Sequence, residues 1–212
     1  MQGEKAEEIG RIAGKEVYLL RGNKKIPFED IEIIVTYGVD EDWELIDFEQ
    51  LPNLKWIQVF QTGIEQVPIE EIAKRNIKLT NVRNIYGSPM SEYVMSIILY
   101  ELRELARFIE NKKLKKYDRT KLVDEASFKT IGIFGTGDLG VEVAKRAKAF
   151  DMTVFGFNSN GRPVEYFDRT FTWEHKDEMI KQCDFIVLLL PLIDRTYHFL
   201  AEREFAMMKD TA

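Results

Sequence analysis

The chain has 212 residues, of which 45% are hydrophobic and 12% aromatic, so it can bury the core of one large domain or two small ones. Its 36 acidic residues outnumber its 30 basic ones, and a net charge of -6 argues against a nucleic-acid partner, which needs clustered lysine and arginine. One cysteine excludes a disulfide framework, no metal-ligand spacing is present, and no apolar run reaches the roughly 18 residues of a membrane span. We therefore expect a soluble, cytoplasmic protein with no membrane partner.

The first 84 or so residues alternate between strand-like and helix-like segments. Short runs rich in β-branched and aromatic residues predict strands over 16–20, 31–36, 54–60 and 77–82. Helices are predicted between them over 41–50 and 69–75, with Pro68 suited to the first turn of the second. Strands separated by helices need crossover connections, so this pattern indicates a parallel sheet covered on both faces.

A longer helix is predicted from Ser88 to about Asn111, with Ser88 as its cap and Pro89 at its first position. Lysines near its end complement the helix dipole and read more simply as a solvated end than as a phosphate-binding patch. Its apolar residues cover several sides, which is typical of a helix buried between layers, domains or subunits. We expect a first domain over residues 1–85 and a second over 86–212.

A second α/β pattern follows an irregular polar stretch. Strands are predicted over 130–134, 152–157 and 185–190, and helices over 139–150 and 174–181. The last strand, FIVLLL, is a continuous apolar run of the kind that is buried on both faces. Both halves of the chain therefore belong to the α/β class.

The motif Gly135-Thr136-Gly137-Asp138-Leu139-Gly140 has the form G-x-G-x-x-G, between the strand TIGIF and the helix that opens with Leu139. This strand–turn–helix–strand context is the one that a dinucleotide-binding fingerprint requires. Gly135 permits the tight turn, Gly137 lets the backbone approach a diphosphate, and Gly140 allows close helix packing. Backbone N–H groups and the helix dipole then stabilise the anion. The alternative is a glycine-rich turn in an unrelated α/β protein.

The second strand of a dinucleotide site usually ends on an acid that binds the adenosine ribose, but Asn158 stands there instead. A neutral side chain does not repel a 2′-phosphate, and Ser159, Asn160 and Arg162 could bind one. NADP therefore stands slightly ahead of NAD as the coenzyme. Arg162 could equally be a solvated loop residue.

Leu190 and Pro191 end the last strand, and Thr196 follows five residues after the proline. Ligands sit at strand ends in such sheets, so these residues are candidates for a coenzyme wall, although Pro191 could merely end the strand. No catalytic residue is assigned. His175 lies in a charged stretch, His198 has no carboxylate nearby in sequence, and Cys183 reads as a small core residue.

Four segments, in this order, resemble the D-isomer-specific 2-hydroxyacid dehydrogenase family, in its glyoxylate/hydroxypyruvate reductase-like branch. They are LKWIQVFQTGIEQVP, NVRNIYGSPMSEYVMSIILYELR (in which Glu92 matches part of an Ala-Glu pair), TIGIFGTGDLG and CDFIVLLLPLIDRTYHFLAEREFAMMK. The resemblance implies a Rossmann-type doubly wound sheet preceded by a smaller flavodoxin-like substrate domain, the two domains being hinged. It also implies hydride transfer between NADP or NAD and a small 2-oxo acid or D-2-hydroxy acid, in a homodimer formed through the region of Ser88.

The same resemblance implies that a glycine-containing turn binds the substrate carboxylate through its backbone N–H groups. That role falls on Gln61, Thr62, Gly63 and Ile64. Some features depart from the family pattern, since the usual first strand lacks an obvious counterpart and the catalytic Arg, Glu and His of the family would lie beyond Ala212. We therefore expect only the N-terminal half of the nucleotide domain, with TIGIF as an open sheet edge.

These departures lead to the expectation that the 212 residues alone have no dehydrogenase turnover. Two other functions remain open on the sequence. One is a nucleotide-sensing scaffold or corepressor of the same fold, and the other is an inactive fragment or regulatory paralogue.

Overall fold

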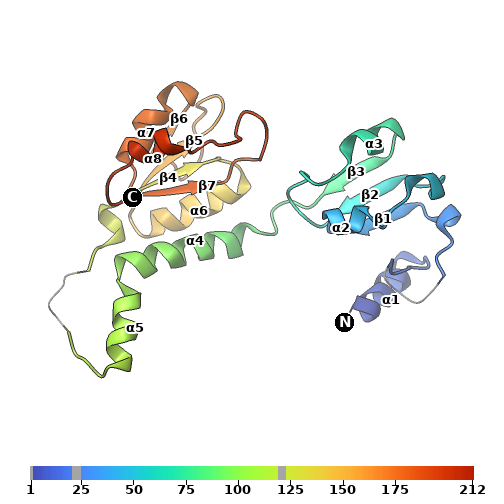
Figure 1. Cartoon of the computed structure of the whole chain (residues 1–212), viewed down its shortest axis with the longest axis horizontal. Helices are drawn as coiled ribbons and strands as arrows, with labels where there is room; N and C mark the ends of the chain where they lie inside the picture. Colours follow the sequence, from blue (N-terminus) through green and yellow to red (C-terminus); the bar gives the residue numbers. More distant parts are fainter. Residues whose placement is uncertain (1, 21–24, 119–122) are drawn as a thin grey trace. The chain divides into compact units, whose positions relative to one another are not determined.

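The computed structural model describes residues 2–20, 25–118 and 123–212, and it divides the chain into two compact units, Met1–Val82 and Arg83–Ala212 (Figure 1). The first unit is built around a three-stranded parallel sheet. Its order is β1 (Ile33–Thr36), β2 (Trp56–Val59) and β3 (Lys78–Asn81), with Ile34 beside Ile57 and Ile57 beside Leu79. The three strands confirm the predictions made for 31–36, 54–60 and 77–82.

The helices of the first unit are short, apart from the first. They are α1 (Gln2–Ala13), α2 (Asp40–Trp43) and α3 (Ile69–Lys74), with 3-10 turns at Phe28–Asp30 and Phe48–Gln50. α3 confirms the helix predicted over 69–75, with Pro68 as its N-cap residue. The core that these elements bury consists of Leu51, Leu54, Ile57, Val59, Val67, Ile72 and Ile77.

Two predictions for this unit were wrong. Residues 16–20 form no strand and pair with none of the strands β1–β3. Leu19 and Leu20 are consequently exposed. The helix predicted over 41–50 is interrupted after Trp43. Asp47 ends that helical pattern because its carboxylate accepts a hydrogen bond from the Glu49 N–H at 3.0 Å and caps the next turn instead. α1 had not been predicted.

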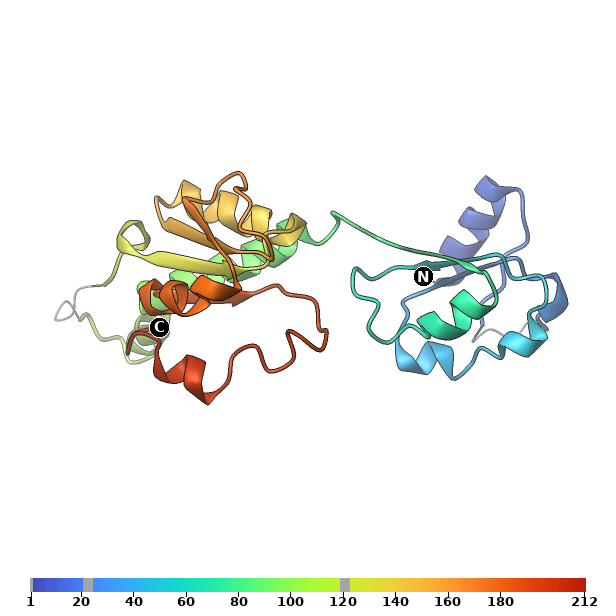
Figure 2. The same cartoon turned by 90° about the horizontal axis from the view of Figure 1, so that it is seen from above.

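The second unit holds a four-stranded parallel sheet with the order β6-β5-β4-β7. These strands are β4 (Thr130–Phe134), β5 (Thr153–Phe157), β6 (Arg169–Phe171) and β7 (Phe185–Leu188). This order corresponds to 3-2-1-4 of a doubly wound dinucleotide fold. Figures 1 and 2 show α4 (Gly87–Leu102) and α6 (Asp138–Ala149) on one face, and α7 (Lys176–Gln182) and α8 (Glu202–Ala206) on the other.

The position of TIGIF in the sheet was predicted wrongly. β6 has only three residues and was missed, so the strands were counted one short, and FIVL is in fact the fourth strand of the domain. β7 pairs with β4 from Ile131 beside Phe185 to Phe134 beside Leu188, so β4 is a central strand and not an open edge. β7 is itself the outer strand of the described sheet, which explains why Phe185, Ile186 and Val187 are only half-buried and Leu188 is exposed.

The long helix predicted from Ser88 to Asn111 is two helices. α4 ends at Leu102 and α5 (Leu105–Lys113) starts after Glu104, whose φ of +47° interrupts the right-handed helix. Ser88 is not the cap, because α4 begins one residue earlier with Tyr86 at the N-cap position. Pro89 is accordingly the third helical residue.

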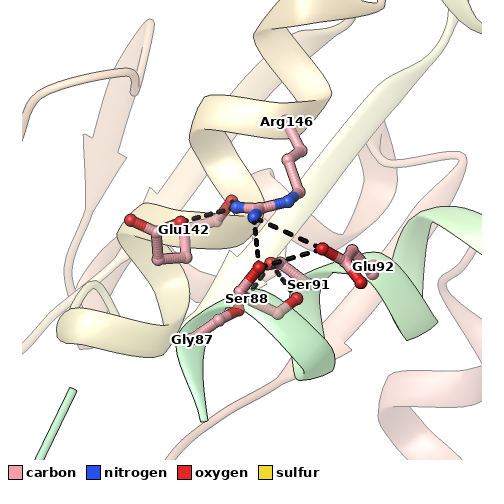
Figure 3. Close-up of polar contacts among 6 residues, drawn as sticks. All are labelled: Gly87, Ser88, Ser91, Glu92, Glu142 and Arg146. Carbon is pink, nitrogen blue, oxygen red and sulfur yellow. Dashed lines mark hydrogen bonds and ion pairs between the residues drawn. The ribbon is translucent and has the colours of Figure 1, made fainter. Parts of the chain in front are cut away.

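Ser88 instead belongs to a polar network that joins α4 to α6 (Figure 3). The Arg146 guanidinium donates to the Ser88 hydroxyl oxygen at 2.9 Å and to the Glu142 carboxylate at 2.5 Å, while the Ser88 hydroxyl donates to Glu92 at 2.9 Å. Ser91, which is fully buried, donates to the Gly87 carbonyl in the same turn. The network holds α6, whose first residue follows the glycine-rich turn, against the start of α4.

The carboxylate of Glu204 in α8 is the most strongly perturbed acid in the described residues. It accepts hydrogen bonds from Lys176 Nζ at 2.8 Å, Arg203 at 3.0 Å and the Ala201 N–H at 3.1 Å. The hydrogen bond from Lys176 is the main cause that lowers the pKa of Glu204 from 4.5 to about 2. Since the folded-state pKa lies below the unfolded one, the stabilisation is present above pH 4.5 and is lost as the pH falls toward 2.

We expect Glu204→Gln to lower the free energy of unfolding by about 2 kcal/mol at pH 7, because a buried charge-assisted network loses its acceptor. The difference between the variant and the unmodified chain should shrink as the pH is lowered from 5 toward 3. Urea unfolding at several pH values measures it. Glu202→Gln, an exposed neighbour on the same helix, should change little, and a pH-independent difference would contradict the assigned role of the charge.

Candidate functional site

Gly135 makes the turn that leaves β4. Its φ is +110°, a conformation that side chains with a Cβ rarely adopt, and a Cβ there would lie 2.7 Å from the carbonyl oxygen of Leu189. The Gly135 N–H donates to the Phe157 carbonyl at 3.0 Å, which ties the turn to the end of β5. Glycine is therefore required at this position by backbone conformation and by the closeness of the β7 end.

Gly137 is the N-cap residue of α6, and the space beside it is open. A Cβ at Gly137 would meet no atom within 4 Å, and no side chain caps the helix. The Val141 N–H donates to the Gly137 carbonyl at 2.9 Å as the first bond of the helix, so the N–H groups of the preceding turn have no intrahelical acceptor. This arrangement of open space, free N–H groups and a positive helix end suits an anion.

Gly140 brings the first turn of α6 onto the turn from β4. A Cβ at Gly140 would overlap the carbonyl oxygen of Gly135 and lie 3.1 Å from its carbonyl carbon. Between these glycines, Asp138 is exposed and Leu139 is half-buried. Close packing of the helix on the turn thus depends on the absence of a side chain at Gly140.

Asn158 links the glycine-rich turn to the loop that follows β5. Its side-chain amide donates to the Thr136 hydroxyl at 3.2 Å and to the Arg162 carbonyl at 3.0 Å, and its carbonyl accepts the Asn160 N–H at 3.3 Å. Both amide hydrogens are therefore used within the protein. Thr136 is buried and had not been recognised as part of the site.

Ser159 and Arg162 lie exposed on this loop. Within the described residues the Arg162 guanidinium forms no ion pair, while its backbone N–H donates to the Asn160 side chain at 3.3 Å. Gly161 has a φ of +69°, and a Cβ there would lie 2.9 Å from Thr172 Cγ2. The loop is thus shaped by asparagine hydrogen bonds and a glycine, and it leaves one arginine charge unneutralised.

The segment after β7 pairs with β4 for one more residue and then forms a loop that is closed by hydrogen bonds of Thr196. The Leu189 N–H donates to the Phe134 carbonyl at 2.8 Å, Leu190 is half-buried and Pro191 is exposed. The Thr196 hydroxyl accepts the Ile193 N–H at 3.0 Å and donates to the Pro191 carbonyl. Thr196 therefore shapes this loop, and Pro191 does not end the strand, which stops at Leu188.

Neither histidine forms an ion pair with a carboxylate among the described residues. His175 is exposed with its Nδ1 3.4 Å from the Thr172 hydroxyl, and exposed His198 has its ring next to Tyr197, with centroids 4.1 Å apart. Cys183 is fully buried, and burial raises the pKa of its thiol to about 12. Over the described ranges there is also no cluster of three or more metal-ligating side chains, and no helix there is long and apolar enough to cross a membrane.

In the first unit, residues 61–64 form an irregular turn after β2. Asn81, on β3, donates from its side chain to the Thr62 carbonyl at 2.7 Å, and the Ile64 carbonyl accepts the Val67 N–H at 3.1 Å. No protein acceptor is found for the N–H groups of Gln61, Thr62, Gly63 or Ile64 in the part of the chain that is described. The turn therefore has two of its carbonyls, those of Thr62 and Ile64, occupied and its N–H groups available, which suits a carboxylate.

The side chains at this turn add two details. Ile64 packs against the core of the unit, whereas Thr62 and Gly63 are exposed. The carboxylate of Glu65 occupies the position that a Cβ on Gly63 would take, so a side chain at residue 63 would clash with it. Asn81 had not been recognised as a supporting residue, because it lies 19 positions from its partner in the sequence.

A family model described as "D-isomer specific 2-hydroxyacid dehydrogenase, NAD binding domain" matches residues 95–212. Among curated proteins, the glyoxylate reductase of Thermococcus gammatolerans is 28% identical over 192 residues, covering 86% of this chain and 57% of the relative. The hydroxypyruvate reductase of Thermotoga maritima is 32% identical over 163 residues, covering 74% of this chain and 51% of the relative. The chain thus spans between half and two thirds of the length of these relatives.

Solved structures show the same likeness. A D-isomer specific 2-hydroxyacid dehydrogenase family protein from Aeromonas salmonicida has a TM-score of 0.83 at 27% identity, over 99% of this chain and 67% of the other. D-lactate dehydrogenase from Aquifex aeolicus, complexed with NAD and lactic acid, has a TM-score of 0.72 at 26% identity over 88% and 57%. The NADPH-dependent glyoxylate/hydroxypyruvate reductase from Sinorhizobium meliloti, in complex with NADP and sulfate, has 0.77 at 25% over 97% and 65%.

Proposed function

The chain belongs to the D-isomer specific 2-hydroxyacid dehydrogenase family. We propose that it functions in an oxidoreductase that transfers hydride between NAD(P)H and a small 2-oxo acid or D-2-hydroxy acid. The observation that carries this proposal is the open space beside Gly137 at the start of α6, next to a turn that only glycine can make at Gly135. The names of the glyoxylate and hydroxypyruvate reductases above support the substrate class.

The coenzyme would be held by the residues at the carboxyl ends of β4, β5 and β7. We assign the diphosphate to the backbone of Gly135, Gly137, Asp138, Leu139 and Gly140, since the first turn of α6 supplies N–H donors and a positive helix end. The loop of Asn158, Ser159 and Arg162 would receive the adenosine ribose, and Leu190, Pro191 and Thr196 would form a wall. When bound, the nicotinamide supplies or accepts the hydride.

The substrate carboxylate would bind the N–H groups of Gln61, Thr62, Gly63 and Ile64. Asn81 and Val67 donate hydrogen bonds to the Thr62 and Ile64 carbonyls, and these bonds fix the backbone of the turn. The N–H groups are therefore in place before an anion arrives, and little reorganisation is needed. Removing the Asn81 side chain would release the Thr62 carbonyl and loosen this turn. We therefore assign Asn81 as a positioning residue for the substrate turn.

For the coenzyme we place NADP slightly ahead of NAD, because Asn158 carries no charge and Arg162 has no ion pair within the described residues. We expect Arg162→Ala to weaken NADPH binding about tenfold, as one charge-assisted contact to the 2′-phosphate is lost, and NADH binding less than about twofold. Fluorescence titration of both coenzymes measures the ratio. Equal losses for the two would count against a phosphate contact.

We also propose that two copies associate through α4. One face of this helix is buried in its own unit, whereas Met90, Tyr93, Ile97 and Tyr100 recur at helical spacing on another face and stay exposed. An apolar stripe of this kind is costly to leave in water and is typical of a contact with a second subunit. Sedimentation velocity tests the association, and a monomer at all concentrations would refute it.

The direct test of the function is titration of the chain with NADPH and NADH, followed by a panel of 2-oxo acids that includes glyoxylate and hydroxypyruvate. Saturable binding of one coenzyme is expected, and failure to bind either would overturn the proposal.

Because neither histidine of the described residues has a carboxylate partner, a second candidate is nucleotide sensing without chemistry. A change of the oligomeric state on coenzyme binding would indicate it. Measurable oxidation would refute it.

A further inference from the structure

Arg195 lies in the loop between β7 and α8, and its guanidinium is stacked on an aromatic ring. The guanidinium carbon is 4.1 Å from the centroid of the Trp173 ring. Trp173 in turn packs edge-on against Phe157, with ring centroids 5.2 Å apart, and Phe157 is the last residue of β5. A cation from the loop after β7 is therefore held over the region where β5 ends.

The loop that carries Arg162 reaches the same region from the other direction. The Asn158 N–H donates to the Phe171 carbonyl at 3.1 Å, and the Thr170 hydroxyl donates to the Gly161 carbonyl at 2.9 Å. Trp173 comes two residues after Phe171, and the Thr172 side chain lies against Gly161. The loop of Arg162 is thus bonded to the end of β6, and Arg195 stacks on Trp173, two residues after that end.

The charge of Arg195 is not neutralised by any ion pair in the described ranges, although Asp194 is its neighbour in sequence. Arg169 provides the contrast, because it stacks on Phe171 at 4.2 Å and also pairs with Glu178 at 2.7 Å. Stacking on a ring fixes the plane of a guanidinium and leaves the N–H groups at its edge free to donate. Arg195 is therefore a positioned cation without a protein anion.

We propose that Arg195 is a second cation, in addition to Arg162, for the 2′-phosphate of NADP, which makes it a specificity-determining residue. The proposal rests on the coenzyme site proposed above. In a doubly wound sheet of this order the adenosine ribose lies at the end of the second strand, which here is β5. Two arginines from separate loops can hold a phosphate with several charge-assisted hydrogen bonds, whereas the unphosphorylated ribose of NAD offers them no charge.

The experiment compares dissociation constants of NADPH and NADH for the unmodified chain, Arg195→Ala, Arg195→Lys and the control Arg169→Ala, each with its melting temperature. We expect Arg195→Ala to weaken NADPH binding about tenfold and NADH binding less than about twofold. Arg195→Lys should recover part of the NADPH affinity, because it keeps the charge without the planar fork. The control should leave the ratio of the two constants unchanged.

The outcomes separate this inference from the function on which it rests. Equal fold-losses for NADPH and NADH would overturn the inference, since they would point to stacking on adenine or to a structural role. Unchanged affinities for both coenzymes in a folded Arg195→Ala would overturn it as well. Tight binding of NADH alone by the unmodified chain would also overturn it while leaving the proposed function in place. Binding of neither coenzyme would overturn both.

Discussion

Replacing Gly137 by alanine is expected to weaken the binding of NADPH and NADH about 100-fold while the melting temperature changes by less than about 2 °C. Gly137 has a φ of -79°, which any residue adopts, and a Cβ at this position meets no protein atom within 4 Å. Alanine therefore fits the free protein. Its methyl group would occupy the space where the backbone must come close to the diphosphate, so the penalty falls on the complex alone.

Titration of both coenzymes into Gly137→Ala, together with thermal unfolding, measures this separation of binding from stability. Asp138→Ala is the matched control in the same turn, because it keeps the backbone N–H and removes only an exposed side chain. Its affinities should stay within about twofold or rise, since a carboxylate near the bound anion is lost. A folded Gly137→Ala with the affinity of the unmodified chain would mean that the diphosphate does not bind at this turn.

The parts of the fold that were predicted well are those where a local pattern and burial agree. β4, α6 and β5 carry an apolar strand, three glycines with separate steric roles and an amphipathic helix in immediate succession, so each element supports the next. β6 failed because three residues, one of them Arg169, are too few to show an alternation. That single omission misplaced β4 at the edge of the sheet.

The apolar periodicity of the sequence also continues across the break between α4 and α5, so it predicted one helix where there are two. Apolar residues recur from α4 into α5, but Glu104 adopts a left-handed conformation that no pattern marks. Ser88 looked like a cap in the sequence, yet its hydroxyl is bound to Arg146, 58 residues away. A local propensity for capping was outweighed by a contact between helices that only the folded chain brings together.

The candidate site divides in the same way. The three glycines could be interpreted from the sequence because their roles depend on the backbone of one turn. The use of the Asn158 amide could not, because its partner Thr136 lies 22 positions earlier, and the support of the substrate turn by Asn81 comes from another strand. Side chains that fix a loop by long-range hydrogen bonds leave no spacing rule in the sequence.

Gly140→Ala should lower the stability of the free protein, unlike Gly137→Ala, which should lower only coenzyme affinity, although the two glycines are three residues apart. A Cβ at Gly140 would overlap the Gly135 carbonyl oxygen, and because the backbone fixes the positions of both atoms, no rotamer change relieves the clash. α6 would have to move away from the turn, and Ala147 and Val143, which are fully buried on α6, would lose packing. We expect the free energy of unfolding to fall by about 3 kcal/mol.

Urea unfolding measures this, with the exposed Lys145→Ala on the same helix as a control that should change it by less than about 0.5 kcal/mol. Unchanged stability in Gly140→Ala would show that α6 does not rest on the turn, and the geometry proposed for the diphosphate would then have no support.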